Sequence, residues 1–147
     1  VYFPRTRHRE VRAAQAAASH AVLPRGTETV MLVEDELLSR DSLACTLREL
    51  GYTVLEAENG ERALQELEKL GGEKLNLLIT DLVMPRLGGQ ALIEQVRPRH
   101  PDLKIILMSG YTDNVATRHH MAELGVVFLQ KPFSSVTIAT KVRQVLK

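Results

Sequence analysis

The chain has 147 residues, of which 44% are hydrophobic and 25% charged, and its net charge is +1. This length fits one domain core with an extension, and no apolar run approaches the ~18 residues of a membrane-spanning helix. A single cysteine, Cys45, excludes an internal disulfide and a cysteine-rich zinc site, so we expect a reducing, cytoplasmic setting. Because no apolar run is long enough to span a membrane, we also expect no membrane contact by this segment.

Residues 1–27 form a basic extension with a net charge of +4, which leaves −3 on the remaining 120 residues. Residues 9–22 are rich in alanine and precede Pro24 and Gly26, so they are expected to form either a linker helix or a solvated coil. The acidic body and the short, aromatic-poor basic stretch argue against binding of nucleic acid. The folded domain is therefore predicted at residues 28–147.

Five short apolar segments rich in β-branched residues are the expected strands, at residues 29–33, 53–57, 75–80, 103–108 and 126–130. Apolar residues recur at helical spacing between them and at the chain's end: Leu43, Leu47 and Leu50; Ala63, Leu64, Leu67 and Leu70; Ile138, Val142, Val145 and Leu146. This alternation predicts an α/β fold, a flavodoxin-like doubly wound (βα)5 sandwich with parallel strand order 2-1-3-4-5. Cys45, within the first helical stretch, is expected in the core.

Polar side chains stand at the carboxyl ends of four expected strands: Glu34 and Asp35, Asp81, Ser109, and Lys131. In the order 2-1-3-4-5 these strands are consecutive neighbours about 4.8 Å apart, so the side chains are expected to converge. Converging carboxylates repel one another, and a hard cation with oxygen ligands such as Mg²⁺ relieves the repulsion. Asp35 and Asp81 are the predicted direct ligands.

A carboxylate beside Mg²⁺ can attack phosphorus, which would make Asp81 an aspartyl phosphate. Lys131 would supply a point charge and Ser109 a hydroxyl donor to phosphoryl oxygens. Taken alone, Asp35 could equally be a helix N-cap, whereas Ser109 would more often be a turn hydroxyl and Lys131 a solvated charge. The joint pattern favours the phosphoryl-transfer interpretation.

The segments VMLVEDE, LLITDLVMP, ILMSGYT and FLQKPF, in this order, resemble the response-regulator receiver family over residues 28–147. The resemblance implies a phosphoacceptor domain of two-component signalling or a phosphorelay, phosphorylated on Asp81. It also implies Mg²⁺ or Mn²⁺ as cofactor, bound by Asp35, Asp81, Glu34 and the main-chain carbonyl of Val83. Such a domain catalyses its own phosphorylation and dephosphorylation without being a turnover enzyme.

The resemblance further implies a switch, in which Ser109 moves to the phosphate, Phe128 turns inward, and the face of the fourth helix, fifth strand and fifth helix changes. That face or the N-terminal segment could also form a dimer. The resemblance also implies that Lys131 is the family's characteristic lysine, with a cis bond to Pro132. The small Gly110 would leave room for the phosphoryl group. Val83 and Tyr111 would tune the access of the hydrolytic water. Glu34 and Phe128 stand where the family more often has aspartate and tyrosine.

The sequence VYFPR followed by PRGTETVMLVEDE is similar to the junction before the receiver of hybrid sensor histidine kinases. Residues 1–27 would then include the remnant of an ATP-binding domain. The expected partners are the kinase's phosphohistidine domain and a histidine phosphotransfer protein. A stand-alone single-domain regulator and a phosphorylation-independent interaction module remain the alternatives.

Two other classes of protein lack their expected residues. A dehalogenase-type phosphatase would carry a second aspartate two residues after its nucleophile, where Val83 stands. A nucleotide-binding domain would have a glycine-rich loop after the first strand, where EDELL stands. His119 and His120 are expected on the surface, without a role in phosphotransfer.

Overall fold

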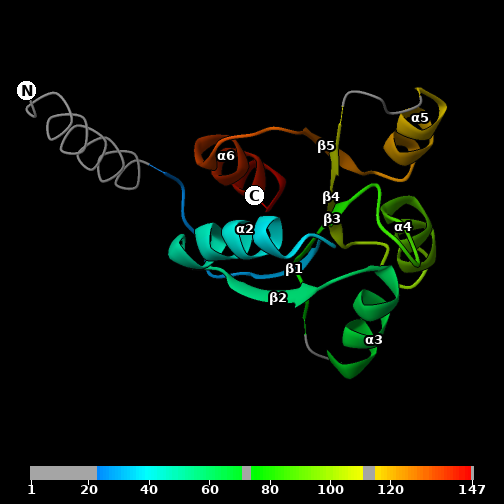
Figure 1. Ribbon diagram of the computed structural model, residues 1–147, viewed down its shortest axis with the longest axis horizontal. Helices are drawn as coiled ribbons and strands as arrows, with labels where there is room; N and C mark the ends of the chain where they lie inside the picture. Colours follow the sequence, from blue (N-terminus) through cyan, green and yellow to red (C-terminus); the bar gives the residue numbers. More distant parts are fainter. Residues whose placement is uncertain (1–22, 71–73, 111–114, 147) are drawn as a thin grey trace, which may run out of the picture.

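A five-stranded parallel sheet forms the centre of the molecule (Figure 1). The computed structural model describes residues 23–70, 74–110 and 115–146. The strands are β1 (Thr29–Val33), β2 (Thr53–Ala57), β3 (Leu77–Asp81), β4 (Lys104–Ser109) and β5 (Val127–Gln130). Their order is β2-β1-β3-β4-β5, with every neighbouring pair parallel, which confirms the predicted topology.

Helices cover both faces of this sheet (Figure 1). They are α2 (Leu37–Glu49), α3 (Gly60–Leu70), α4 (Gly89–Val96), α5 (Val115–Glu123) and α6 (Ser135–Leu146). Buried residues of α2 and α6 share one core cluster, whereas those of α3, α4 and α5 share the other. The two faces therefore have separate cores, as expected when right-handed crossovers alternate sides.

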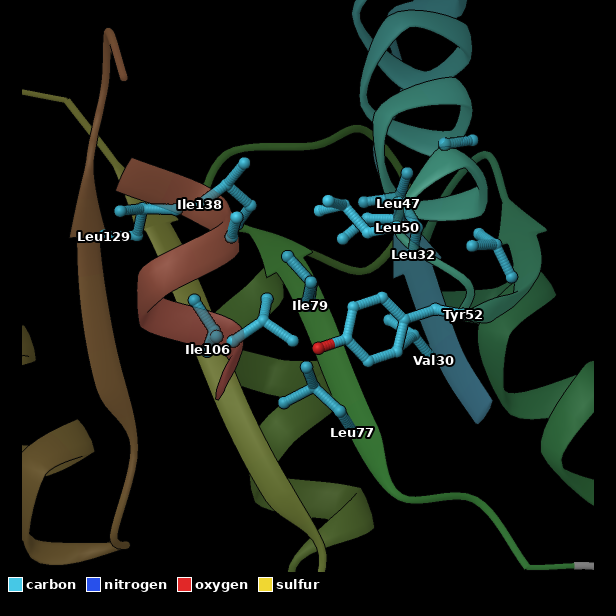
Figure 2. Packing of buried hydrophobic residues seen from close by; sticks show 14 of the residues in the cluster. Val30, Leu32, Leu47, Leu50, Tyr52, Leu77, Ile79, Ile106, Leu129 and Ile138 are labelled. Carbon is cyan, nitrogen blue, oxygen red and sulfur yellow. The ribbon is translucent and has the colours of Figure 1, made fainter. Parts of the chain in front are cut away.

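Aliphatic side chains fill the core beneath α2 and α6 (Figure 2). β1 contributes Val30 and Leu32 and β3 contributes Leu77 and Ile79, all fully buried. Because these central strands are buried on both faces, they read as continuous apolar runs rather than as alternating patterns.

Strand boundaries differ from the prediction by one or two residues. β3 runs to Asp81, because Asp81 pairs with Met108 of β4. β4 likewise runs to Ser109, which pairs with Gln130 of β5. Asp81 and Ser109 are thus held by the sheet itself rather than by the loops that follow it.

The prediction that Cys45 lies in the core is wrong. Its side chain is exposed, with Sγ 3.7 Å from Oε1 of Glu49 on the same helix. Ala44 and Leu47 make the buried contacts of α2. Each residue turns a helix by about 100°, so a residue next to Ala44 can project away from the stripe that Ala44 and Leu47 define.

Packing against the domain begins before residue 28. Leu23 is buried in the core cluster of α2 and α6, although residues 1–27 are expected from sequence to be an extension. The guanidinium of Arg25 donates to the Glu49 carbonyl at 2.9 Å, and Gly26 N–H donates to the Leu50 carbonyl at 3.1 Å. The expected helix at residues 9–22 lies outside the described residues.

An ion pair links Glu28, directly before β1, to Arg143 of α6. Nη2 of Arg143 lies 2.6 Å and Nη1 3.2 Å from the carboxylate oxygens of Glu28, and each side chain is about three-quarters buried, at 24% and 23% exposure. The hydrogen bond from Arg143 is the largest cause that lowers the pKa of Glu28, from 4.5 to about 2. Such charge-assisted, two-point contacts stabilise more than exposed pairs do.

Replacing Glu28 with glutamine is therefore expected to lower the free energy of unfolding by about 1–2 kcal/mol near pH 7. The folded-state pKa is depressed, so the contribution is present above pH 4.5 and is lost as the pH falls from 4.5 to about 2. Urea unfolding across this range measures it. The control is Glu61→Gln, whose partner Arg86 is 3.7 Å away in an exposed pair; an equal loss in both variants would contradict the prediction.

Candidate functional site

The predicted site residues meet at the carboxyl edge of the sheet. Backbone hydrogen bonds extend the ladder beyond the strand ends: Glu34 N–H donates to the Ala57 carbonyl at 3.1 Å, and Lys131 N–H to the Ser109 carbonyl at 2.7 Å. These bonds fix where the loops after β1 and β5 begin. The side chains of Glu34 and Lys131 are consequently held 3.1 Å apart, from Oε2 to Nζ.

Three carboxylates gather there. Glu34, Asp35 and Asp81 each offer a carboxylate oxygen, and the three oxygens lie within 4.8 Å of one another. Nζ of Lys131 lies 3.2 Å from Oδ2 of Asp81 as well as 3.1 Å from Glu34. In the described part of the chain, three acids thus gather beside one ammonium group, an arrangement with excess negative charge.

Glu34 is the most deeply buried member of this cluster, with its side chain only 4% exposed. Burial is the main cause that raises the pKa of Glu34, and the charge of Asp81 adds to it. The N–H of Glu36 donates to Oε1 at 3.1 Å, and Arg40 donates to the Glu34 carbonyl at 2.8 Å. The first turn of α2 therefore holds Glu34 in place.

Lys131 is not the solvated charge that it could have been from sequence alone. Burial disfavours the charged form of its amine, but the hydrogen bond to Glu34 and the charges of Asp81 and Glu34 outweigh burial and raise the pKa of Lys131. The amine is therefore protonated at neutral pH. It is held between the carboxylate of Glu34, which follows β1, and that of Asp81, the last residue of β3.

Asp81 combines burial with access. Its side chain is 14% exposed, Oδ1 accepts the Leu82 N–H at 2.9 Å, and Oδ2 faces Lys131. Asp35 is exposed, and the helix N-cap position belongs to Glu36, so Asp35 does not cap α2. Asp35 is therefore available to the cluster.

Ser109 carries a hydroxyl that has no hydrogen-bond partner within residues 23–70, 74–110 and 115–146. Its Oγ is buried, and the residue is 1% exposed at the end of β4. Unpaired buried polar groups cost free energy and are uncommon, so this hydroxyl is a candidate ligand group. At the next residue, Gly110, an added β-carbon would meet no atom of the described, non-adjacent residues within 4 Å.

The structure also describes Val83, Phe128 and the peptide bond between Lys131 and Pro132. Val83 is 76% exposed after β3, and Phe128 is partly buried against the core of α3, α4 and α5. The peptide bond between Lys131 and Pro132 is cis, as expected. Tyr111 lies outside the described residues, so the predicted tuning of water access by Val83 and Tyr111 stays a prediction.

Both histidines of α5 lie on the surface, as predicted. His119 is 78% exposed and lies 3.0 Å from Glu123, and His120 is 46% exposed and lies 3.3 Å from Glu94. Neither is part of the carboxylate cluster.

A groove of about 470 Å³ between α2 and α6 opens beside the cluster, and sequence reasoning missed it. Glu34 and Lys131 line it, together with Leu38, Phe133 and Ile138. Leu37 and Leu38, in the first turn of α2, are 57% and 77% exposed. The available signal was this leucine pair directly after the acidic residues, where a solvent-facing turn would ordinarily be polar.

None of the helices in the described part of the chain has the length and hydropathy needed to cross a membrane.

Comparisons with known proteins agree on one family. The family model of the response regulator receiver domain matches residues 30–143. The chain is 42% identical over 122 residues to the sensor kinase CckA of Brucella abortus, a match that covers 83% of this chain and 13% of the kinase. It is 33% identical to the probable transcriptional regulator ycf27 of Porphyridium aerugineum, covering 82% of this chain and 48% of that protein.

A solved structure agrees with these relatives. The crystal structure of the receiver domain from the hybrid histidine kinase CckA superposes with a TM-score of 0.68 at 36% identity, covering 81% of this chain and 99% of that one. The chain thus spans about half or less of the two curated relatives named above, but nearly all of a solved receiver domain.

Proposed function

Because the chain belongs to the response regulator receiver domain family, we propose that it accepts a phosphoryl group from a phosphohistidine donor onto Asp81. One observation supports this proposal most: Glu34, Asp35 and Asp81 converge at one sheet edge with the ammonium of Lys131. Two-component signalling is the setting of this family, and the cytoplasm is the proposed compartment.

The cluster suits a hard divalent cation. Its donors are all oxygens, and among the described residues Lys131 is the one cation in contact with them, which leaves the three carboxylates under-neutralised. Asp35, Asp81, Glu34 and the main-chain carbonyl of Val83 would hold Mg²⁺ or Mn²⁺. When bound, the ion would neutralise the cluster and the incoming phosphoryl oxygens.

The chemical step is an in-line displacement. A carboxylate oxygen of Asp81 forms a bond to phosphorus while the bond from phosphorus to the donor's imidazole nitrogen breaks, and the imidazole leaves with the electron pair. Lys131, already 3.2 Å from Oδ2, donates to one phosphoryl oxygen. The unpartnered Oγ–H of Ser109 donates to another and so acquires the hydrogen bond that it lacks.

The phosphoryl group adds about 1.5–2 negative charges beside Ser109. In the proposed switch Ser109 moves toward it, Phe128 turns inward, and the face of α5, β5 and α6 changes its affinity for partners. The same face, or the N-terminal segment, is the proposed contact of a dimer. This mechanism needs one bistable pair of residues rather than a rearrangement of the sheet.

The parent protein is proposed to be a hybrid histidine kinase that passes the phosphoryl group to a histidine phosphotransfer protein. The match to CckA, of which this chain covers 13%, supports it. A stand-alone regulator is the alternative, since regulators such as ycf27 also match. A phosphorylation-independent module is disfavoured, because Asp35, Asp81 and Lys131 are all present.

The groove between α2 and α6 is the proposed docking surface for the phosphohistidine protein. It is continuous with the site, because Glu34 and Lys131 line both. A helix that lays an apolar stripe across Leu38 would bring its histidine to the edge where Asp81 lies. The exposed side chains of Leu37 and Leu38 would then contact the partner protein.

We expect Leu38→Glu to slow phosphoryl transfer from a phosphorylated histidine phosphotransfer domain by about tenfold or more, the usual cost of losing a buried interface anchor. Phosphorylation by acetyl phosphate, a donor too small to contact the groove, should be unchanged. The control is Val115→Glu on α5, which is similarly exposed at 80% but distant from the groove. Equal slowing with both donors would contradict a docking role.

Intact-protein mass spectrometry after incubation with acetyl phosphate tests the proposed function. One phosphoryl adduct is expected with Mg²⁺ and none with excess EDTA. An adduct that forms equally in EDTA would contradict the metal requirement. The Asp81→Asn variant, which lacks the proposed phosphoacceptor carboxylate, should form no adduct.

A further inference from the structure

Phe128 shares one face of the sheet with Ser109. Phe128 of β5 pairs with Leu107 of β4, and paired residues of parallel strands point to the same side. Ser109 is two residues after Leu107, so its side chain also points there. Leu107 and Phe128 belong to the packing beneath α4 and α5. The hydroxyl that lacks a partner and the aromatic ring thus face the same helices.

Arg118 contacts that ring from α5. Its Cζ lies 5.1 Å from the centroid of the Phe128 ring, within the range of a cation–π interaction. Met121, three residues later on the same side of the helix, is fully buried, which directs this side of α5 toward the sheet. Arg118 forms no ion pair with any described residue, and its guanidinium contacts the Phe128 ring.

We infer that the ring position beside Arg118 is the outward one of the proposed switch, and that Arg118 is a positioning residue that holds Phe128 there and thereby opposes the switch. This inference rests on the proposed function, because it concerns the ring that would turn inward when Asp81 is phosphorylated. The contact is present while Ser109 Oγ has no hydrogen-bond partner among the described residues, so the proposal places it in the state before phosphorylation. In the proposed switch a ring that turns inward would move away from the guanidinium, so the contact would stabilise only one of the two states.

A contact shifts a two-state equilibrium only by the difference between its interaction free energies in the two states. An exposed cation–π contact would bias the outward state about 2- to 5-fold. Arg118→Gln, which removes the charge but keeps a long polar side chain, should raise the inward-to-outward ratio by about that factor. Arg118→Lys should give an intermediate ratio, because an ammonium is also attracted to a ring face.

The ratio can be measured by ¹⁹F NMR of protein labelled with 4-fluorophenylalanine. The chain has three phenylalanines, and Phe3→Leu and Phe133→Leu assign the Phe128 resonance. Spectra are compared without phosphodonor and after acetyl phosphate with Mg²⁺, which define the two end points. The matched control is His119→Gln, which removes a neighbouring exposed side chain that pairs with Glu123 instead.

Supporting results are a shift of the donor-free Phe128 resonance toward the phosphorylated position in Arg118→Gln, partial restoration in Arg118→Lys, and no shift in His119→Gln. An unchanged ratio in Arg118→Gln, with the Asp81 adduct still seen by mass spectrometry, overturns this inference alone. Absence of an adduct in the wild type overturns the proposed function and this inference together. A fall in melting temperature without the ratio change would indicate a merely structural contact and also overturn it.

Discussion

Replacing Asp81 with asparagine is expected to abolish phosphoryl uptake from acetyl phosphate and from a phosphohistidine donor. The change is isosteric, but a carboxamide is a poor nucleophile toward phosphorus and a poor ligand for a hard cation. Intact-protein mass spectrometry should show the adduct in the wild type and none in the variant. Because Oδ1 still accepts the Leu82 N–H, we expect the fold to persist.

The matched control for this experiment is Asp102→Asn. Asp102 is exposed, precedes β4 and lines a pocket with Lys104, the first residue of that strand, so it lies at the opposite edge from the cluster. The Asp102→Asn variant should form the phosphoryl adduct on Asp81 at the wild-type rate. A stable adduct of equal yield in Asp81→Asn would show that another residue accepts the phosphoryl group and would overturn the central assignment.

Replacing Lys131 with methionine is expected to slow adduct formation by about 10²-fold, the usual loss when one preorganised donor to a developing charge is removed. Methionine keeps much of the length of the side chain but leaves Glu34 and Asp81 without their ammonium. Glu34 is 4% exposed, so its carboxylate cannot turn to bulk water. A further loss of about 1–3 kcal/mol in unfolding free energy is therefore expected.

Stopped samples analysed by mass spectrometry give the rate, and urea unfolding gives the stability. Lys104→Met, at the opposite edge of the sheet and exposed, is the control and should change neither. Lys131→Arg should recover stability better than rate, because a planar guanidinium keeps the charge but not the compact geometry. A wild-type rate in Lys131→Met would remove Lys131 from the proposed mechanism.

Periodicity alone was sufficient for the architecture. Apolar runs of strand length, separated by helical stripes, leave a parallel sheet with helices on both faces as the compact solution, and right-handed crossovers leave few strand orders. Cys45 shows where this reasoning fails. A small apolar residue beside Ala44 is compatible with either side of a helix, and only the packing of α2 decides that it faces solvent.

The identity of the candidate site residues was also readable from the sequence, because residues at the carboxyl ends of parallel strands share one edge. Glu34, Asp81 and Lys131 follow that rule directly. Their pairing was not readable: a ladder that extends one residue further than expected places Asp81 within β3 and sets Lys131 between two carboxylates. Register depends on backbone hydrogen bonds between strands distant in sequence, which no local pattern encodes.

By itself the sequence determined the fold class and the set of acids and base at the sheet edge, because both follow from spacing along one chain. It narrowed the strand order to a few possibilities, of which 2-1-3-4-5 is the common one. Only the tertiary structure decided the buried state of Glu34, the unpartnered hydroxyl of Ser109, the groove between α2 and α6, and the contact of Arg118 with Phe128. Each of these depends on distances between side chains of different elements. Such distances are set by how the helices pack on the sheet, and packing is a property of the whole molecule.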